Sequence, residues 1–170
     1  MIVWISGIPA AGKTTLGQAL AEELGADLID SHDLRVARAD QDFSREGRRK
    51  NVVMLAVEAG LRSSIGGVDV VVACISPYRD DRMVARYIAE AMNEKFFCVW
   101  LQCSVQAAEA RDMKGLYFMA RTGKAKNVTG VDDPYEYGPD FDLEFETDHA
   151  SVAHCLEKTL AKVRPNGKDR

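Results

Sequence analysis

The segment that most constrains this chain is residues 7–14, GIPAAGKT, which matches the phosphate-loop pattern G-x-x-x-x-G-K-[ST]. An apolar strand candidate at residues 1–6 precedes it, and an amphipathic helix candidate at residues 15–25 follows it. In that order, the loop's backbone N–H groups and the positive end of the helix together suit a polyphosphate. The flanking patterns argue against a chance match. The segment therefore predicts a site for a nucleoside triphosphate.

The residues of this loop have separable tasks. Lys13 supplies a charge for the outer phosphates, and the hydroxyl of Thr14 is an oxygen ligand of the kind that Mg²⁺ prefers. The other expected contacts to ATP come from the loop and the start of the helix: Gly7, Ala10, Ala11, Gly12 and Thr15. We therefore expect ATP as a co-substrate and Mg²⁺ as the cofactor.

The composition fits one domain. The 170 residues are 46% hydrophobic, and the net charge of −4 disfavours a nucleic-acid or membrane-surface binder. Four cysteines without C-x-x-C pairing suggest a reducing compartment, and the chain has neither a signal-peptide pattern nor an apolar run of membrane-spanning length. We expect a cytoplasmic protein with one domain at residues 1–164 and a flexible tail at residues 165–170.

Strand and helix patterns alternate along the chain. After the first strand, further strands are predicted at residues 27–30, 68–75, 96–103 and 143–147. After the first helix, further helices are predicted at residues 45–64, 80–93, 104–112 and 152–163. This alternation predicts a phosphate-loop type of α/β fold with three layers (α/β/α) and a five-stranded parallel sheet. Ligands should bind at the carboxyl ends of the strands.

A polar cluster, DSHDLR, follows the second predicted strand, where such a sheet would place it beside the phosphate loop. Asp30, His32 and Asp33 are candidates to take a proton, and Asp30 is also a candidate magnesium ligand. Arg35 offers a forked guanidinium group for an anionic substrate. The alternative is a helix N-terminal cap, for which Asp30 is equally suited.

Two further segments carry candidate binding residues. Residues 76–79 (SPYR) follow the third predicted strand, so their side chains could face the same cleft, with a plain helix start as the alternative. Residues 113–138 combine lysines, an arginine and glycines over a length that is unusual for a simple connection. We predict that this segment is a mobile lid that closes over phosphates, against the alternative of a flexible surface loop.

Together these segments resemble the adenylylsulfate kinases, phosphate-loop enzymes that move the γ-phosphoryl group of ATP to the 3′-hydroxyl of adenosine 5′-phosphosulfate (APS). The resemblance is carried by GIPAAGKTTL, DSHDLR, DFSREGRRKN, ISPYRDDR and RDMKGLYFMARTGKAKNVTGVDDPYE. It implies that Phe43 stacks on the acceptor's adenine, that Arg111 contacts ATP, and that the protein is a homodimer. It also implies that the acceptor site includes Arg35, Arg48, Asn51, Ile75, Ser76 and Lys114.

The chain departs from this family pattern in two places. Where the family reads D-G-D-N-x-R, His32 replaces the second carboxylate. Either His32 or Asp33 then takes the proton, or positioning and Mg²⁺ suffice. Where the family's lid reads G-F-T-G, Val128 replaces the phenylalanine that closes the adenine stack. Loss of one stacking partner would cost about 1 to 3 kcal/mol of base binding.

Three functions fit these residues. The first is ATP-dependent phosphorylation of APS, and the second is the same chemistry on a related nucleotide such as cytidine diphosphoramidate, which Val128 modestly favours. The third is a regulatory module that binds nucleotide without transfer, which the change at His32 would permit. Because Lys13, Arg48 and Asn51 are retained, the sequence predicts a kinase.

Overall fold

Five short strands form one parallel sheet. The computed structural model describes residues 1–165. The strands are β1 (Ile2–Ser6), β2 (Asp27–Asp30), β3 (Val70–Ala73), β4 (Phe96–Gln102) and β5 (Leu143–Glu146). They pair in the order β2-β3-β1-β4-β5, and all pairs are parallel. The predicted five-stranded parallel sheet is confirmed.

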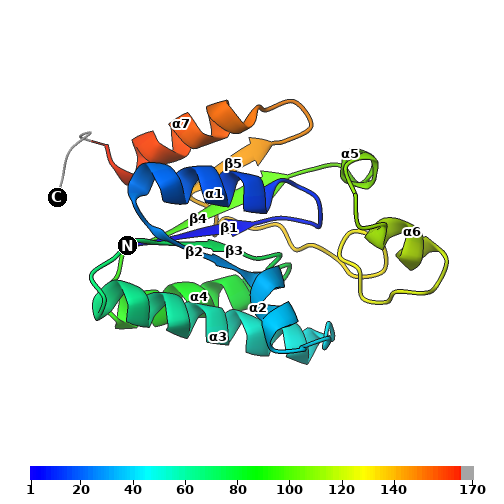
Figure 1. Ribbon diagram of the computed structural model, residues 1–170, viewed down its shortest axis with the longest axis horizontal. Coiled ribbons are helices and arrows are strands. Elements are labelled where there is room, and N and C mark those ends of the chain that lie inside the picture. Colours follow the sequence, from blue (N-terminus) through cyan, green and yellow to red (C-terminus); the bar gives the residue numbers. More distant parts are fainter. Residues whose placement is uncertain (166–170) are drawn as a thin grey trace.

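Long helices cover both faces of the sheet. Helices α1 (Lys13–Leu24) and α7 (Val152–Val163) lie on one face, and α3 (Arg45–Ser64) and α4 (Arg79–Ala91) lie on the other (Figure 1). The side chains of β1 alternate between the two layers. Val3 packs in the hydrophobic cluster with α1, whereas Trp4 packs in the cluster with α3. The predicted three-layer arrangement is therefore confirmed, with element ends within two residues of those expected.

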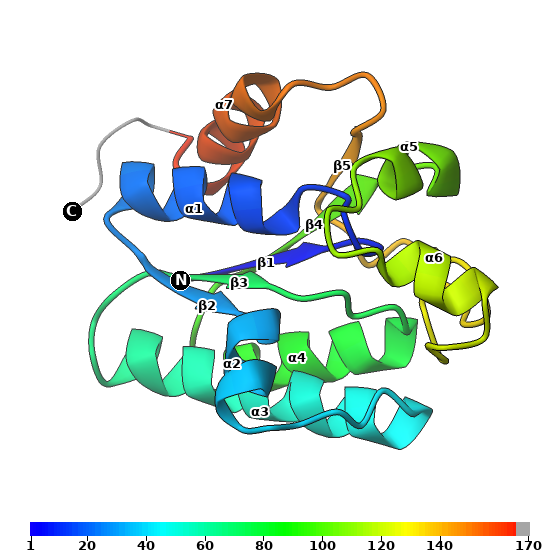
Figure 2. The same cartoon turned by 45° about the vertical axis from the view of Figure 1, so that its right-hand side comes forward.

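Three short helices lie toward the end of the sheet where the strands finish (Figure 2). They are α2 (Ser31–Ala37), α5 (Val105–Ala110) and α6 (Leu116–Arg121). The start of α5 was predicted correctly, because the side chain of Ser104 accepts a hydrogen bond of 3.2 Å from the amide of Ala107. No helix was predicted at α2 or α6, since six or seven residues carry too little periodicity to be recognised.

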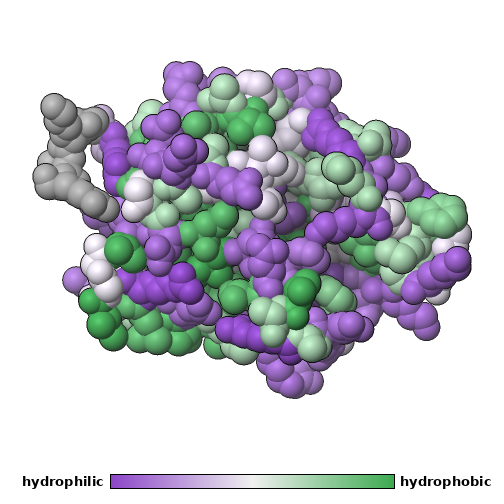
Figure 3. All heavy atoms as spheres, viewed as in Figure 1, coloured by the Kyte–Doolittle hydropathy of each residue, from purple (hydrophilic) through white to green (hydrophobic). Residues whose placement is uncertain are grey.

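The surface and the cysteines add two observations. Hydrophobic residues gather at the lower left of Figure 3, over the C-terminal half of α3. The exposed apolar side chains there are Met54, Val57 and Leu61 of α3 and Ile65, which follows directly after the helix. All four cysteines are free thiols.

Two expectations concern the chain's ends and the membrane. Of the tail predicted as flexible, residues 166–170 lie outside the described range. Within residues 1–165, none of the helices has the length and apolar character needed to cross a membrane.

Candidate functional site

A cavity of about 860 Å³ opens where β1, β2 and β3 end, a volume typical of ligand sites. The phosphate loop, the start of α2 and the first half of α3 line it, together with the turn that follows β3 and the turn that precedes α7. The structure therefore brings together residues that are far apart in the sequence. Most of the residues proposed from the sequence line this cavity. The exceptions are Gly7, Asp33, Tyr78, Arg79 and Val128.

The phosphate loop has a backbone shape that its sequence makes possible. At Gly7 an added Cβ would lie 2.6 Å from the carbonyl oxygen of Leu101, so only glycine fits beside β4. Gly12 has φ 97°, a left-handed conformation, at the start of α1. These features open the loop so that the N-terminal end of α1 faces the cavity, as a phosphate site requires.

Lys13 is held inside this loop. Its Nζ donates a hydrogen bond of 2.7 Å to the carbonyl oxygen of Ile8. Burial lowers the pKa of Lys13 from 10.5 to about 8, although the nearby Cys74 and Asp30 act in the opposite direction. A bound polyphosphate would add negative charge beside this half-buried ammonium group and so favour its charged form.

Asp30 joins β2 to the phosphate loop. Its Oδ2 accepts a hydrogen bond of 2.6 Å from the hydroxyl of Thr14, and its Oδ1 accepts one of 2.8 Å from the amide of His32. Asp30 therefore contacts the loop and also caps α2. The cap alternative is confirmed, and the roles of Asp30 as proton acceptor and magnesium ligand stay predictions.

The donor atoms at Thr14 and Asp30 fit Mg²⁺, which prefers oxygen ligands and takes most of its shell from phosphates and water. Within residues 1–165, no three His, Cys, Asp or Glu side chains come together as a metal site.

The two candidates in α2 for accepting the proton, His32 and Asp33, differ in their position relative to the cavity. Both side chains are exposed, but only His32 lines the cavity. One step along a helix rotates the side chain by about 100°, which separates Asp33 from its neighbour. The suggestion that Asp33 replaces the missing carboxylate is therefore not supported by its position.

Arg35 is largely committed to protein partners. Its NH1 group donates hydrogen bonds of 2.9 Å to the Asp40 carboxylate and of 2.9 Å to the carbonyl oxygen of Asp42. Its guanidinium group also lies 4.7 Å from the ring centre of Phe43. Phe43 is 40% exposed and lines the cavity. Arg35 thus supports an aromatic ring that is accessible for stacking.

Arg48 and Asn51 lie side by side on α3 and line the cavity while being buried. Burial lowers the pKa of Arg48, and the carboxylate of Asp133, 3.6 Å away, opposes this shift. Asn51 donates a hydrogen bond of 2.9 Å to the hydroxyl of Ser31. Its Oδ1 atom is buried without a partner, the one such side-chain atom in the described part of the chain. An unpaired buried acceptor costs about 1 to 3 kcal/mol, which a ligand with a hydrogen-bond donor would recover.

The turn after β3 presents backbone to the cavity. Ser76 has φ 42°, an uncommon left-handed conformation for a residue with a side chain. Its hydroxyl accepts a hydrogen bond of 2.9 Å from Trp4 Nε1, and its carbonyl oxygen accepts one of 2.9 Å from Arg82. The hydroxyl of Ser6 similarly donates to the carbonyl oxygen of Ile75 at 2.8 Å. Buried donors thus fix both backbone groups at the cavity wall.

Arg82 is a supporting residue that sequence reasoning missed. It is 1% exposed and bonds to both carboxylate oxygens of Asp140, at 2.6 and 3.3 Å. It also donates to the carbonyl oxygen of Glu136 at 2.7 Å. Its position in a polar stretch of α4 gives no sequence signal of burial, because Asp140 lies 58 residues away.

Residues near both ends of the predicted lid segment, residues 113–138, form hydrogen bonds with the rest of the domain. Tyr117 and Val128 are buried, whereas Lys114 is exposed and lines the cavity. The amide of Val128 donates to Asp132 at 2.6 Å, and its side chain lies outside the cavity lining. Val128 therefore does not occupy the position of a stacking residue in this conformation. Arg111, just before the lid, lines the cavity and donates to the carbonyl oxygen of Thr147 at 2.9 Å.

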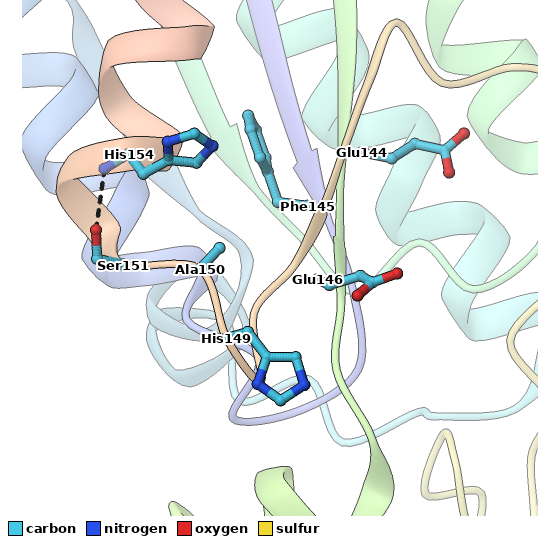
Figure 4. A pocket seen from close by; sticks show the side chains of 7 residues that line it. All are labelled: Glu144, Phe145, Glu146, His149, Ala150, Ser151 and His154. Carbon is cyan, nitrogen blue, oxygen red and sulfur yellow. Dashed lines mark hydrogen bonds between the residues drawn. The ribbon is translucent and has the colours of Figure 1, made fainter.

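A second hollow, of about 520 Å³, lies beside β5 and the start of α7 (Figure 4). The ring of His154 meets Phe145 edge to face at 6.2 Å, whereas Glu144 and Glu146 point away from His154. Because its acidic and imidazole groups do not converge, this hollow offers no arrangement for catalysis.

Comparisons with known proteins agree on one family. The family model described as adenylylsulphate kinase matches residues 1–146. An adenylyl-sulfate kinase of Geotalea daltonii is 35% identical over 98% of this chain and 84% of its own length. Adenylyl-sulfate kinase 3 of Arabidopsis thaliana is 37% identical over 98% of this chain and 83% of its own length.

Solved structures give the same result. The APS kinase of Mycobacterium tuberculosis, determined in complex with AMPPNP and APS, has a TM-score of 0.87 and is 30% identical; the match covers 95% of this chain and 96% of that one. A shikimate kinase from Acinetobacter baumannii, 20% identical with a TM-score of 0.65 and covering 99% of this chain and 95% of its own, shares the fold.

Proposed function

This chain belongs to the adenylylsulfate kinase family, and we propose that it transfers the γ-phosphoryl group of ATP to the 3′-hydroxyl of APS. The observation that carries the proposal is that one cavity is lined both by the phosphate loop and by the aromatic ring of Phe43 and the side-chain amide of Asn51. The mycobacterial relative was solved with an ATP analogue and APS together, which supports two nucleotides in one cleft.

The donor half of the site comprises the phosphate loop, Lys13, Thr14 and Arg111. The buried ammonium group of Lys13 and the open amides at the start of α1 would bind the phosphates of ATP. Mg²⁺, held by the oxygens of Thr14 and Asp30, would neutralise charge on the transferring phosphoryl group. Arg111, which also lines the cavity, would contact ATP.

The acceptor half comprises Phe43, Arg48, Asn51 and the turn at Ser76. Phe43 offers an exposed aromatic face for the base, and Arg48 offers a buried positive charge for an anionic group. The unpaired Oδ1 of Asn51 requires a donor, which a nucleotide hydroxyl or amino group supplies. Lys114 adds an exposed positive charge from the lid.

The transfer itself needs little covalent assistance from the protein. The acceptor's 3′-oxygen forms a bond to the γ-phosphorus while the bond to the β,γ-bridging oxygen breaks, and ADP leaves. We assign the hydroxyl proton to His32, because His32 lines the cavity and Asp33 does not. Asp30 positions Thr14 and the start of α2 instead. Positioning by both halves of the site supplies most of the catalysis.

A second acceptor, such as cytidine diphosphoramidate, rested on the replacement at Val128. Since Val128 is 4% exposed and lies outside the cavity lining, it places no direct constraint on the base in this conformation. APS is therefore the acceptor that we propose. A regulatory module without transfer is disfavoured by the intact donor half.

An ADP-release assay coupled to NADH oxidation tests this function. The purified protein receives ATP and Mg²⁺ with APS, with cytidine diphosphoramidate as the comparison acceptor and Lys13→Ala as the inactive control. The proposal requires APS-dependent ADP from the parent alone. APS-independent hydrolysis, or no ADP with any acceptor, would contradict it.

We also propose a cytoplasmic homodimer. The exposed apolar side chains Met54, Val57, Leu61 and Ile65 recur every three or four residues along one side of α3 and at the residue directly after it. A second copy packing on α3 would cover them. The four free thiols fit a reducing compartment.

A further inference from the structure

Tyr117 connects the lid to the phosphate loop. It lies in α6, and its hydroxyl donates a hydrogen bond of 2.9 Å to the carbonyl oxygen of Pro9. The side chain is fully buried in the same hydrophobic cluster as Leu16 and Leu101. Burial raises the pKa of the Tyr117 hydroxyl, so this group stays protonated and acts as a donor.

The hydrogen bond from Tyr117 to Pro9 matters because the Pro9 carbonyl belongs to the same peptide group as the Ala10 amide. A trans peptide is planar, so its carbonyl and amide groups point in opposite directions. Ala10 has φ 60°, a left-handed conformation that residues with a side chain rarely adopt. Within residues 1–165, the Ala10 amide donates to no other backbone group. By holding the Pro9 carbonyl, Tyr117 therefore fixes the direction of a phosphate-loop amide that is free to bind a ligand.

Other contacts fix the position of α6. The amide of Tyr117 donates to Asp112 at 2.8 Å, and the guanidinium group of Arg121 bonds to both carboxylate oxygens of Glu109, at 2.6 and 2.9 Å. A Cβ at Gly130, farther along the lid, would lie 3.7 Å from the side chain of Ile8. The hydroxyl of Tyr117 thus joins α6 to the phosphate loop, and displacement of α6 would release the Pro9 carbonyl.

We propose that Tyr117 is a positioning residue for ATP. Its hydrogen bond to the Pro9 carbonyl orients the Ala10 amide toward the phosphates. The same bond couples the position of α6 to nucleotide binding. The inference rests on the proposed kinase function, since it requires ATP in the phosphate loop. Coupling between two sites is reciprocal, so bound nucleotide must in turn hold α6 in place.

The test compares two variants that each remove one buried tyrosine hydroxyl. Tyr117→Phe removes the bond to Pro9, and Tyr135→Phe removes the 2.6 Å bond to the hydroxyl of Ser6. For Tyr117→Phe we expect the dissociation constant of AMPPNP to rise on the order of tenfold. Binding of AMP, which lacks the outer phosphates, should not change. Tyr135→Phe should bind AMPPNP like the parent.

Hydrogen exchange supplies a second readout. In the parent, AMPPNP should slow amide exchange in α6 (Leu116–Arg121), and in Tyr117→Phe this protection should be lost. If Tyr117→Phe does not fold, exchange in the parent still decides, because unchanged α6 exchange on binding would overturn the coupling. Equal AMPPNP affinity in the parent and in a folded Tyr117→Phe would also overturn it. Failure of the parent itself to bind AMPPNP would overturn the proposed function and this inference with it.

Discussion

The hydroxyl of Thr14 donates a hydrogen bond of 2.6 Å to Oδ2 of Asp30, and this bond joins the end of the phosphate loop to the end of β2. Both residues lie at the edge of the sheet where parallel strands finish, so their contact follows from the fold. It places a hydroxyl and a carboxylate where Mg²⁺ and the phosphates of ATP would meet. This contact belongs to the donor half that we propose.

Lys13 gives the first prediction. Because burial lowers its pKa from 10.5 to about 8, the folded protein without nucleotide binds fewer protons than the unfolded chain between these pH values. Lys13 should therefore destabilise the folded protein most below pH 8. As the pH rises to 10.5, the free energy of unfolding should increase by at most about 3 kcal/mol. Lys13→Met should remove this slope in denaturant titrations. The same slope in both proteins would show that Lys13 is not the group responsible.

Removing the aromatic ring of Phe43 should weaken binding of the acceptor and leave binding of ATP unchanged. Phe43→Ala should raise the KM for APS by a factor corresponding to about 1 to 3 kcal/mol, because a stacking surface is lost. The KM for ATP should remain at the parent value, since Phe43 belongs to the acceptor half that we propose and not to the phosphate loop. Phe43→Tyr, which retains the ring, is the matched control. A similar rise in both KM values for Phe43→Ala would remove this residue from the acceptor site.

Arg82 and Asp140 form a buried ion pair, so breaking it from one side should be costly. Arg82→Met leaves the carboxylate of Asp140 without its main partner and should lower the free energy of unfolding by about 3 to 5 kcal/mol. Adding Asp140→Asn to Arg82→Met should restore part of this loss, because the uncompensated charge disappears. A double-mutant cycle from urea unfolding measures this coupling, and strictly additive effects would contradict it.

The apolar side of α3 gives a prediction about assembly. Leu61→Glu places a charge in the exposed stripe and should shift the protein from dimer to monomer in light scattering coupled to size-exclusion chromatography. Tyr87→Glu alters an exposed side chain on α4 and should leave the dimer intact. A parent that is monomeric at all concentrations, or a dimeric Leu61→Glu, would exclude this surface.

The sequence predicted the sheet, the long helices and the phosphate loop because each rests on local patterns of apolar residues and glycines. It did not predict α2 or α6, whose few residues depend on tertiary contacts such as that of Tyr117 with Pro9. Arg82 was missed for a related reason, since its partners Ser76 and Asp140 come from separate segments. For Val128, the family resemblance suggested a position in the predicted lid, but its burial depends on tertiary contacts of that segment.

The central claim is that the cavity holds two nucleotides and passes a phosphoryl group between them. The most direct measurement follows γ-³²P-labelled ATP with APS and Mg²⁺ and identifies the labelled product by chromatography and nuclease digestion. The account predicts label on the 3′-oxygen of APS, absent with Lys13→Ala. Label that appears only as inorganic phosphate, or on a different acceptor but never on APS, would contradict it.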